Sequence, residues 1–141
     1  MMRYTCVSLL CMILCLSAPR GFAQDASLDP LLKAITEGDE AKVKTLLEGG
    51  SSATAAAVDG VTPLHAAAYA GSKPITDLLL ERGADVNARA TGDIRPLHIA
   101  AERCSDRVIP TLLEAGATLE AVNGEGATSL HMAAMAGCMK A

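Results

Sequence analysis

The sequence is poor in aromatic side chains and has no basic block. Its 141 residues include only three aromatics, Tyr4, Phe22 and Tyr69, and no tryptophan. A core filled by large rings is therefore excluded. Close-packed helices with alanine at their contacts are favoured instead, because alanine is the most frequent residue type. Nucleic-acid binding is not expected, because the formal net charge is −4 and lysine and arginine do not cluster.

The segment 1–23 has the parts of a secretory signal peptide. Arg3 gives a positive start, an apolar run follows from about Val7 to Leu16, and Ala23 is a small residue at the expected cleavage point. The apolar run is too short to span a bilayer comfortably. The sequence therefore predicts a signal peptide at 1–23 and an exported mature domain at 24–141, either periplasmic or extracellular. An uncleaved N-terminal anchor is the alternative.

A fixed period runs through the rest of the chain. The tetrapeptide Thr62-Pro63-Leu64-His65 recurs as Arg95-Pro96-Leu97-His98 and, after the same interval, as Thr128-Ser129-Leu130-His131. Paired alanines, paired leucines and a Gly-Ala dipeptide recur at the same offset. Agreement at many positions indicates a repeated structural unit.

Each unit predicts two short helices and a finger. Thr62 is a good N-cap, and Pro63 suits the first helical position because its missing N–H is not needed there. Gly71 is expected to end this helix, and Gly83 the following one. The turn-rich residues between units suit β-turn fingers. One unit cannot bury its own apolar stripe, so the units are expected to stack as a solenoid.

The segment GVTPLHAAAYAGSKPITDLLLERGADVNAR at 60–89 resembles the ankyrin repeat throughout its length. The other copies follow the same pattern with decreasing fidelity. The resemblance implies an all-α ankyrin-repeat solenoid of helix-turn-helix pairs with β-turn fingers. It has about three and a half repeats, at about 28–56, 57–89, 90–122 and, incompletely, 123–141. It also implies a protein-binding module without catalytic groups.

The third copy departs from the pattern in three places. Arg95 replaces the capping threonine and cannot accept the amide hydrogen bonds of a helix start, so we expect a weaker start or a cap from Asp93. Gly92 precedes Asp93, which reverses the order of Asp59 and Gly60 and predicts a different or more mobile turn. Pro110 predicts a kink or a late start of the second helix.

The fourth copy has a first helix but no second one. Met132, Met135 and Met139 are expected on or near an open end of the stack, where a solenoid needs a polar cap. Three interpretations stay open. The chain is a fragment of a longer protein, it self-associates end to end through the incomplete last repeat, or a half-repeat is a sufficient cap.

The histidines His65, His98 and His131 recur at the same place in each unit, which invites a metal hypothesis. Helices in contact lie about 8–10 Å apart, whereas zinc needs nitrogen ligands about 2 Å from one ion. The three rings therefore cannot converge, and no metal or cofactor is expected. Each ring is expected to hydrogen-bond beside the hydroxyl of its own Thr62-type residue and to tie the finger to the helix.

Cys104 and Cys138 are an even pair in a chain predicted to be exported, so a disulfide is considered. Their positions fall on adjacent inter-helix turns, which we expect about 8–10 Å apart. A disulfide requires Cα atoms within about 7 Å of each other, so this bridge needs the last unit to bend. Pairing of Cys138 with another chain is the alternative.

No arrangement of nucleophile and base and no phosphate-binding loop is evident, so an enzyme is not predicted. The resemblance instead places partner-binding positions on the finger tips and on the exposed, concave side of the first helices. These positions are Asp59, Val61, Tyr69, Ala70, Arg89, Thr91, Ile94, Glu102, Arg103, Glu125, Met135 and Ala136.

Tyr69 is the strongest candidate contact, because it is the only aromatic of the mature segment and tyrosine is enriched in binding hot spots. The alternative is that it only covers the neighbouring finger. The expected function is binding of another protein, in support or protection of an enzyme in the same compartment. An immunity-type or inhibitor protein that neutralises a secreted toxin or hydrolase is the alternative. No membrane contact beyond the signal segment is expected.

Overall fold

The structure is a computed structural model that describes residues 30–57 and 59–138. The signal peptide predicted at 1–23 lies outside the described residues. The helices in the described part of the chain are α2 (Pro30–Glu37), α3 (Glu40–Glu48), α4 (Pro63–Ala70), α5 (Lys73–Glu81), α6 (Pro96–Glu102), α7 (Val108–Glu114) and α8 (Ser129–Met135).

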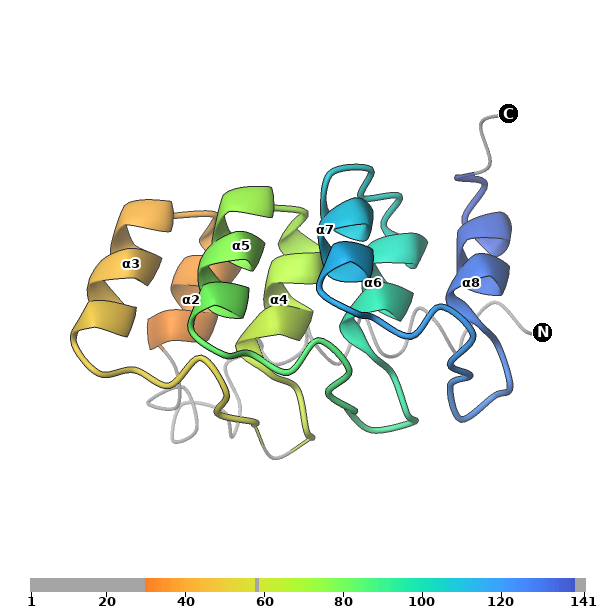
Figure 1. Ribbon diagram of the computed structural model, residues 1–141, viewed down its shortest axis with the longest axis horizontal. Helices are drawn as coiled ribbons and strands as arrows, with labels where there is room; N and C mark the ends of the chain where they lie inside the picture. Colours follow the sequence, from red (N-terminus) through yellow and green to blue (C-terminus); the bar gives the residue numbers. More distant parts are fainter. Residues whose placement is uncertain (1–29, 58, 139–141) are drawn as a thin grey trace, which may run out of the picture. The chain divides into compact units, whose positions relative to one another are not determined.

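These helices form two layers. In one layer α4, α6 and α8 pack in order, and in the other α3, α5 and α7 do so (Figure 1). Within a unit, α4 packs against α5 and α6 against α7. The loops between units extend from one side of the helices as fingers (Figure 1). The predicted all-α stack of helix pairs is therefore confirmed.

Extended pairing in the described part of the chain is limited to two isolated bridges in the fingers. One joins Ala90 to Ile94 and the other joins Val122 to Thr128. Of the helices that the structure describes, none has both the length and the apolar character needed to cross a membrane.

Small side chains bring neighbouring first helices close together. In α4, Ala66, Ala67 and Ala68 are buried, and Leu64 is fully so. Alanine lets backbones approach, and leucine fills the space that remains. This core needs no large ring, as the composition predicts.

Helix α4 begins and ends where the sequence predicts. Thr62 is its N-cap and Pro63 its first residue. Gly71 ends it with a φ of +69°, in the left-handed region that glycine enters without steric cost. The equivalent residue one unit later is Cys104, which has a φ of +54°. A side chain at this position is uncommon, because left-handed backbone disfavours residues that carry a Cβ atom.

The expected substitute cap of α6 is wrong. The helix begins at Pro96, and the backbone N–H of Arg95 donates to Nδ1 of His98 at 3.0 Å. A histidine inside the helix therefore satisfies the first donor, and no side-chain acceptor at position 95 is needed. Asp93 does not cap the helix, since its carboxylate lies 3.5 Å from Nη1 of Arg89.

The turn of the third finger differs from that of its neighbours, as predicted, because Gly92 and Asp93 both have a positive φ, whereas in each neighbouring finger only one turn residue, a glycine, does. The backbone N–H of Ala90 donates to the oxygen of Ile94 at 2.8 Å, as Ala57 does to Val61 at 2.9 Å. Asp93 supplies the positive φ that glycine supplies in the other fingers. The aspartate backbone tolerates this conformation better than most residues do, so the reversed dipeptide changes the turn but keeps the bond between Ala90 and Ile94.

Pro110 shortens α7 without kinking it. The helix begins at Val108, which places Pro110 in the first turn, where a proline removes no intrahelical hydrogen bond. The late start predicted from the sequence is confirmed.

Candidate protein-binding surface

Two buried histidines tie the helix pairs α4–α5 and α6–α7 to the next finger. Nδ1 of His65 accepts the backbone N–H of Thr62 at 3.1 Å and lies 2.8 Å from the hydroxyl oxygen. Its Nε2 therefore carries the proton and donates to the carbonyl oxygen of Ile94 at 3.0 Å. Nε2 of His98 lies 2.8 Å from the oxygen of Ala121 in the next finger. The predicted role of these rings is confirmed.

Burial keeps the two histidines neutral. It lowers the pKa of His65 and of His98 below the ordinary value of 6.5, although the hydrogen bonds to backbone carbonyls oppose the shift. Protonation at Nδ1 would remove the acceptor on which the helix start depends. Within residues 30–57 and 59–138, no three His, Cys, Asp or Glu side chains are grouped to hold a metal ion.

Backbone hydrogen bonds join neighbouring fingers. The N–H of Thr91 donates to the oxygen of Asp59 at 2.8 Å, and the N–H of Gly124 donates to the oxygen of Gly92 at 2.6 Å. A Cβ atom on Gly124 would lie 3.1 Å from that oxygen, so glycine permits the close approach. The fingers are therefore held in a fixed relation, which reduces the ordering cost of binding.

Arg103 lies over the ring of Tyr69. Its guanidinium carbon is 4.6 Å from the ring centroid, which is within the range of a cation–π contact. Tyr69 is partly buried near the end of α4, and Arg103 is exposed just after α6. The contact therefore joins two adjacent units on the side where partner contacts are predicted.

Glu102 stands next to this pair and is partly buried. Burial raises the pKa of its carboxyl group above 4.5, and the neighbouring charge of Arg103 partly opposes the shift. An incompletely hydrated carboxylate beside an exposed guanidinium forms a centre of mixed charge. Such a centre favours one orientation of a charged partner.

The structure leaves most of the predicted contact residues accessible. The exposed or partly exposed ones are Asp59, Tyr69, Ala70, Arg89, Thr91, Glu102, Arg103, Glu125, Met135 and Ala136. Val61 and Ile94 are only 8% and 7% exposed, so the exposure expected of these two residues is wrong. Ile94 is drawn into the stack because its carbonyl oxygen bonds to the buried His65. Val61 holds the equivalent place one unit earlier.

A disulfide joins Cys104 to Cys138, with Cα atoms 5.3 Å apart. The separation of about 8–10 Å expected between adjacent turns is therefore wrong for this pair. That expectation used the distance between helix axes, whereas the two cysteines are separated by 34 residues, one more than the period. The extra residue places Cys138 opposite the inter-helix turn of the preceding unit.

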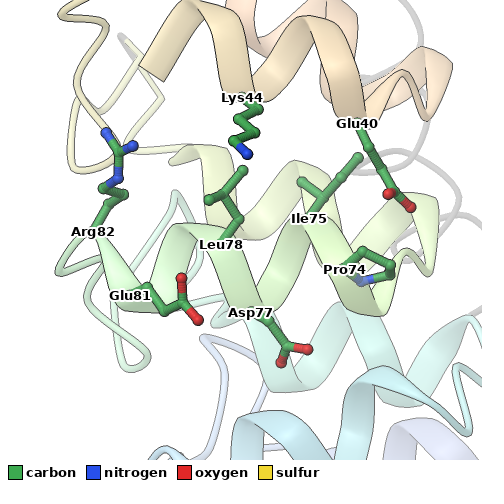
Figure 2. Close-up of a pocket in the computed structure, with 8 residues that line it drawn as sticks. All are labelled: Glu40, Lys44, Pro74, Ile75, Asp77, Leu78, Glu81 and Arg82. Carbon is green, nitrogen blue, oxygen red and sulfur yellow. The ribbon is translucent and has the colours of Figure 1, made fainter. Parts of the chain in front are cut away.

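The helices of the other layer form a groove that sequence analysis did not identify. It lies between α3 and α5, has a volume of about 460 Å³, and places Ile75 and Leu78 among charged side chains (Figure 2). The charged residues are Glu40, Lys44, Asp77, Glu81 and Arg82. Side chains of both signs line it, so the groove has no single electrostatic preference. The groove exists only because α3 and α5 pack side by side, so no local sequence motif indicates it.

Comparison with known proteins gives two kinds of match. A family model described as "Ankyrin repeats (3 copies)" matches residues 3–90, which is more than half of the chain. Ankyrin repeat and SOCS box protein 2 of Rattus norvegicus is 45% identical over 47 residues, which cover 33% of this chain and 7% of that protein. The protein of the same name from Mus musculus matches with the same identity and coverage. The similarity thus spans less than a tenth of either relative.

Proposed function

Because the chain belongs to the ankyrin-repeat family, we propose that it binds a partner protein through one continuous surface. Ankyrin repeats are protein-binding modules and are typically non-catalytic. The proposed surface consists of the first-helix face, defined as Tyr69, Glu102, Arg103 and Met135, and of the finger residues Asp59, Arg89, Thr91 and Glu125.

The stacking of Arg103 on Tyr69 carries this proposal. The contact fixes two side chains of the types that are most enriched in binding hot spots, so less conformational entropy is lost when a partner docks. Glu102 adds a charge of opposite sign within the same patch. The patch therefore combines an aromatic anchor with charges that orient the partner.

We also propose that the protein is exported and that it supports or protects an enzyme of the same compartment. The support for export is the positive Arg3, the apolar stretch from about Val7 to Leu16 and the small Ala23. Mass spectrometry of the protein recovered from its own cells tests this. A mature N-terminus at Gln24 is expected, whereas an intact chain in the cytoplasm would contradict export.

A comparative pull-down tests the binding surface. The full chain and the Tyr69→Ala/Arg103→Ala variant serve as baits, and Lys44→Ala, which lies in the groove of the other layer, is the matched control. The intact chain and the control are expected to capture the same protein, and the double variant to lose it. Equal capture by all three baits would contradict the proposed surface.

An activity assay of the captured protein then separates the two roles. An unchanged or longer-lived activity in the complex agrees with a supporting role. Loss of a hydrolase or toxin activity in the complex would instead identify an inhibitor.

A further inference from the structure

Among the inter-helix turns that the structure describes, the turn after α6 has a cysteine where the others have glycine. Gly38, Gly71 and Gly137 occupy this position in the other units, with φ values of +74°, +69° and +73°. Cys104 occupies it after α6, with a φ of +54°. Residues with a side chain disfavour this region, because the Cβ atom comes too close to the following carbonyl oxygen. The cysteine therefore stands here against the backbone preference that the other turns follow.

The left-handed residue closes the end of α6. The N–H of Cys104 donates to the oxygen of Ala101 at 3.2 Å. The N–H of Ser105 donates to the oxygen of Ala100 at 2.9 Å. This pair of bonds is the Schellman motif, which requires a left-handed residue just after the helix. The last turn of α6 therefore depends on the conformation of Cys104.

The residue before this turn belongs to the proposed binding surface. Arg103 is the C-cap of α6, and its guanidinium carbon lies 4.6 Å from the centroid of the Tyr69 ring. If the two bonds that close the helix break, the backbone of Arg103 is free to turn. Its side chain then leaves the ring, so the contact between Arg103 and Tyr69 depends on the turn that follows.

The disulfide to Cys138 holds this turn from outside α6. The two Cα atoms are 5.3 Å apart, and Cys138 lies in the next unit, 34 residues along the chain. The bridge is also accessible, because Cys104 is exposed. Gly71 has the same place in a unit that a complete unit follows, and it is partly exposed too. Access is therefore a property of this turn, and exposed disulfides are reduced more readily than buried structural ones.

We propose that the disulfide between Cys104 and Cys138 is a redox switch for the protein-binding surface, an inference that rests on the function proposed above. When the bridge is closed, Cys104 stays left-handed and Arg103 stays on the Tyr69 ring. When the bridge is reduced, Cys104 leaves the left-handed region, the end of α6 frays and Arg103 leaves the ring. The oxidised chain therefore binds its partner, and the reduced chain releases it.

The reductant of this switch is a dithiol. One of its thiolates attacks a sulfur atom of the bridge and forms a mixed disulfide, while the other cysteine of the chain leaves as a thiolate. The second thiol of the reductant then attacks the mixed disulfide. Two electrons and two protons pass to the chain, so its S–S bond becomes two thiols and one S–S bond forms in the reductant.

Two variants of the full chain separate this switch from a general loss of stability. The serine variant, Cys104→Ser/Cys138→Ser, lacks the bridge but keeps a Cβ atom in the turn. The glycine variant, Cys104→Gly/Cys138→Ser, also lacks the bridge but restores the glycine and serine found at the equivalent positions 71 and 105. Glycine adopts the left-handed conformation without help from a bridge. Each variant and the native chain are studied with and without dithiothreitol.

NMR spectroscopy measures the chemical shifts of the Arg103 side-chain protons, which the ring current of Tyr69 moves upfield. The upfield shift is expected in the oxidised native chain and in the glycine variant, and it should be lost in the reduced native chain and in the serine variant. Dithiothreitol should not change the glycine variant, which retains the cysteines at 6, 11 and 15 and so controls for them. This measurement requires no partner.

The same samples then serve as baits for the partner. The oxidised native chain and the glycine variant should capture it, and the other two samples should lose it. An upfield shift that persists in the reduced native chain would overturn the switch, and so would equal loss of the shift in both variants. Circular dichroism that shows the whole reduced chain unfolded would also overturn it, because the switch requires a local change. Equal capture by all samples, with the shift lost as expected, would support the redox-dependent turn and contradict the binding surface.

Discussion

A Cβ atom built on Gly71 would lie 3.3 Å from Oγ of Ser105. Cys104 and Cys138 have the same relationship, because they are the equivalents of Gly71 and Ser105 in the next unit. The stacking of units therefore brings these two positions together, and cysteine at both allows a disulfide. The bridge follows from the repeat geometry and requires no bending of the last unit.

Removing the bridge should destabilise the chain. Cys104→Ser/Cys138→Ser is expected to lower the free energy of unfolding by about 3 kcal/mol, because a loop of 34 residues is no longer closed in the unfolded state. Urea denaturation with and without reductant measures the effect. Reductant should destabilise the native chain to a similar extent and leave the variant unchanged. A native chain that is insensitive to reductant would contradict this prediction.

The equivalent pair one unit earlier should accept a second bridge. In Gly71→Cys/Ser105→Cys, the two new thiols are expected to form a disulfide under air oxidation, since Cys104 already adopts the same left-handed backbone. Peptide mapping under non-reducing conditions detects the bridge. The control is Gly71→Cys/Ser72→Cys, which should leave both thiols free because adjacent residues on one turn do not meet the geometric requirement.

The stability lost when a histidine is replaced should depend on whether its Nε2 atom bonds to the next finger. His65→Leu leaves the buried oxygen of Ile94 and the N–H of Thr62 without partners, which should cost about 2 kcal/mol or more. His131→Leu removes only the local bonds to the partly exposed Thr128 and should cost much less. Thermal unfolding of both variants compares them directly. Equal losses would contradict the role assigned to Nε2.

Stability should fall as the solution becomes mildly acidic. The pKa of His98 is lowered in the folded state, so the unfolded chain binds more protons. The contribution of the neutral ring is therefore complete above pH 6.5 and is lost as the pH falls from there through the folded-state pKa. His98→Gln keeps an acceptor for the N–H of Arg95 but does not titrate. Between about pH 7.5 and 5.5, its unfolding free energy should depend less on pH than that of the native chain.

Glu102→Gln should stabilise the folded chain at neutral pH. Its pKa is raised in the folded state, so ionisation opposes folding and the penalty appears as the pH rises through that pKa. The variant is expected to be slightly more stable than the native chain at about pH 7 and equal to it below the ordinary carboxyl pKa of about 4. Unfolding curves at both pH values test this. Equal stability at neutral pH would show that Arg103 fully offsets the burial.

Local signals in the sequence are sufficient to predict the helices and the role of the histidines. Thr62, Pro63 and Gly71 specify the bounds of α4 through short-range bonding and backbone preference, so tertiary packing hardly alters them. Contacts between units are less predictable. By the period Tyr69 is equivalent to Glu102, yet its ring contacts the next residue, Arg103. A period identifies equivalent positions but does not say which of them face each other.

The buried finger residues show a second reason why the sequence predictions and the structure differ. The sequence predicts exposure of Val61 and Ile94 from their place near the finger tips, but both are buried, and at Ile94 a hydrogen bond from His65 holds the finger against the preceding helix. Such a bond depends on the neighbouring unit, and one repeat taken alone does not contain it. The groove between α3 and α5 likewise requires two units.

The bonds between the fingers have a consequence for how this surface can evolve. They join main-chain atoms, from Thr91 to Asp59 and from Gly124 to Gly92. Glycine is required at Gly60 and Gly124, where a Cβ atom would lie 2.8 Å and 3.1 Å from a backbone oxygen of the next or preceding finger, and the Thr91 hydroxyl adds a bond to Asp59. The bonds place little demand on the other tip residues. Substitutions at the tips can therefore accumulate while the hydrogen bonds between the fingers stay intact. A lineage could exchange one binding partner for another at little expense to the scaffold.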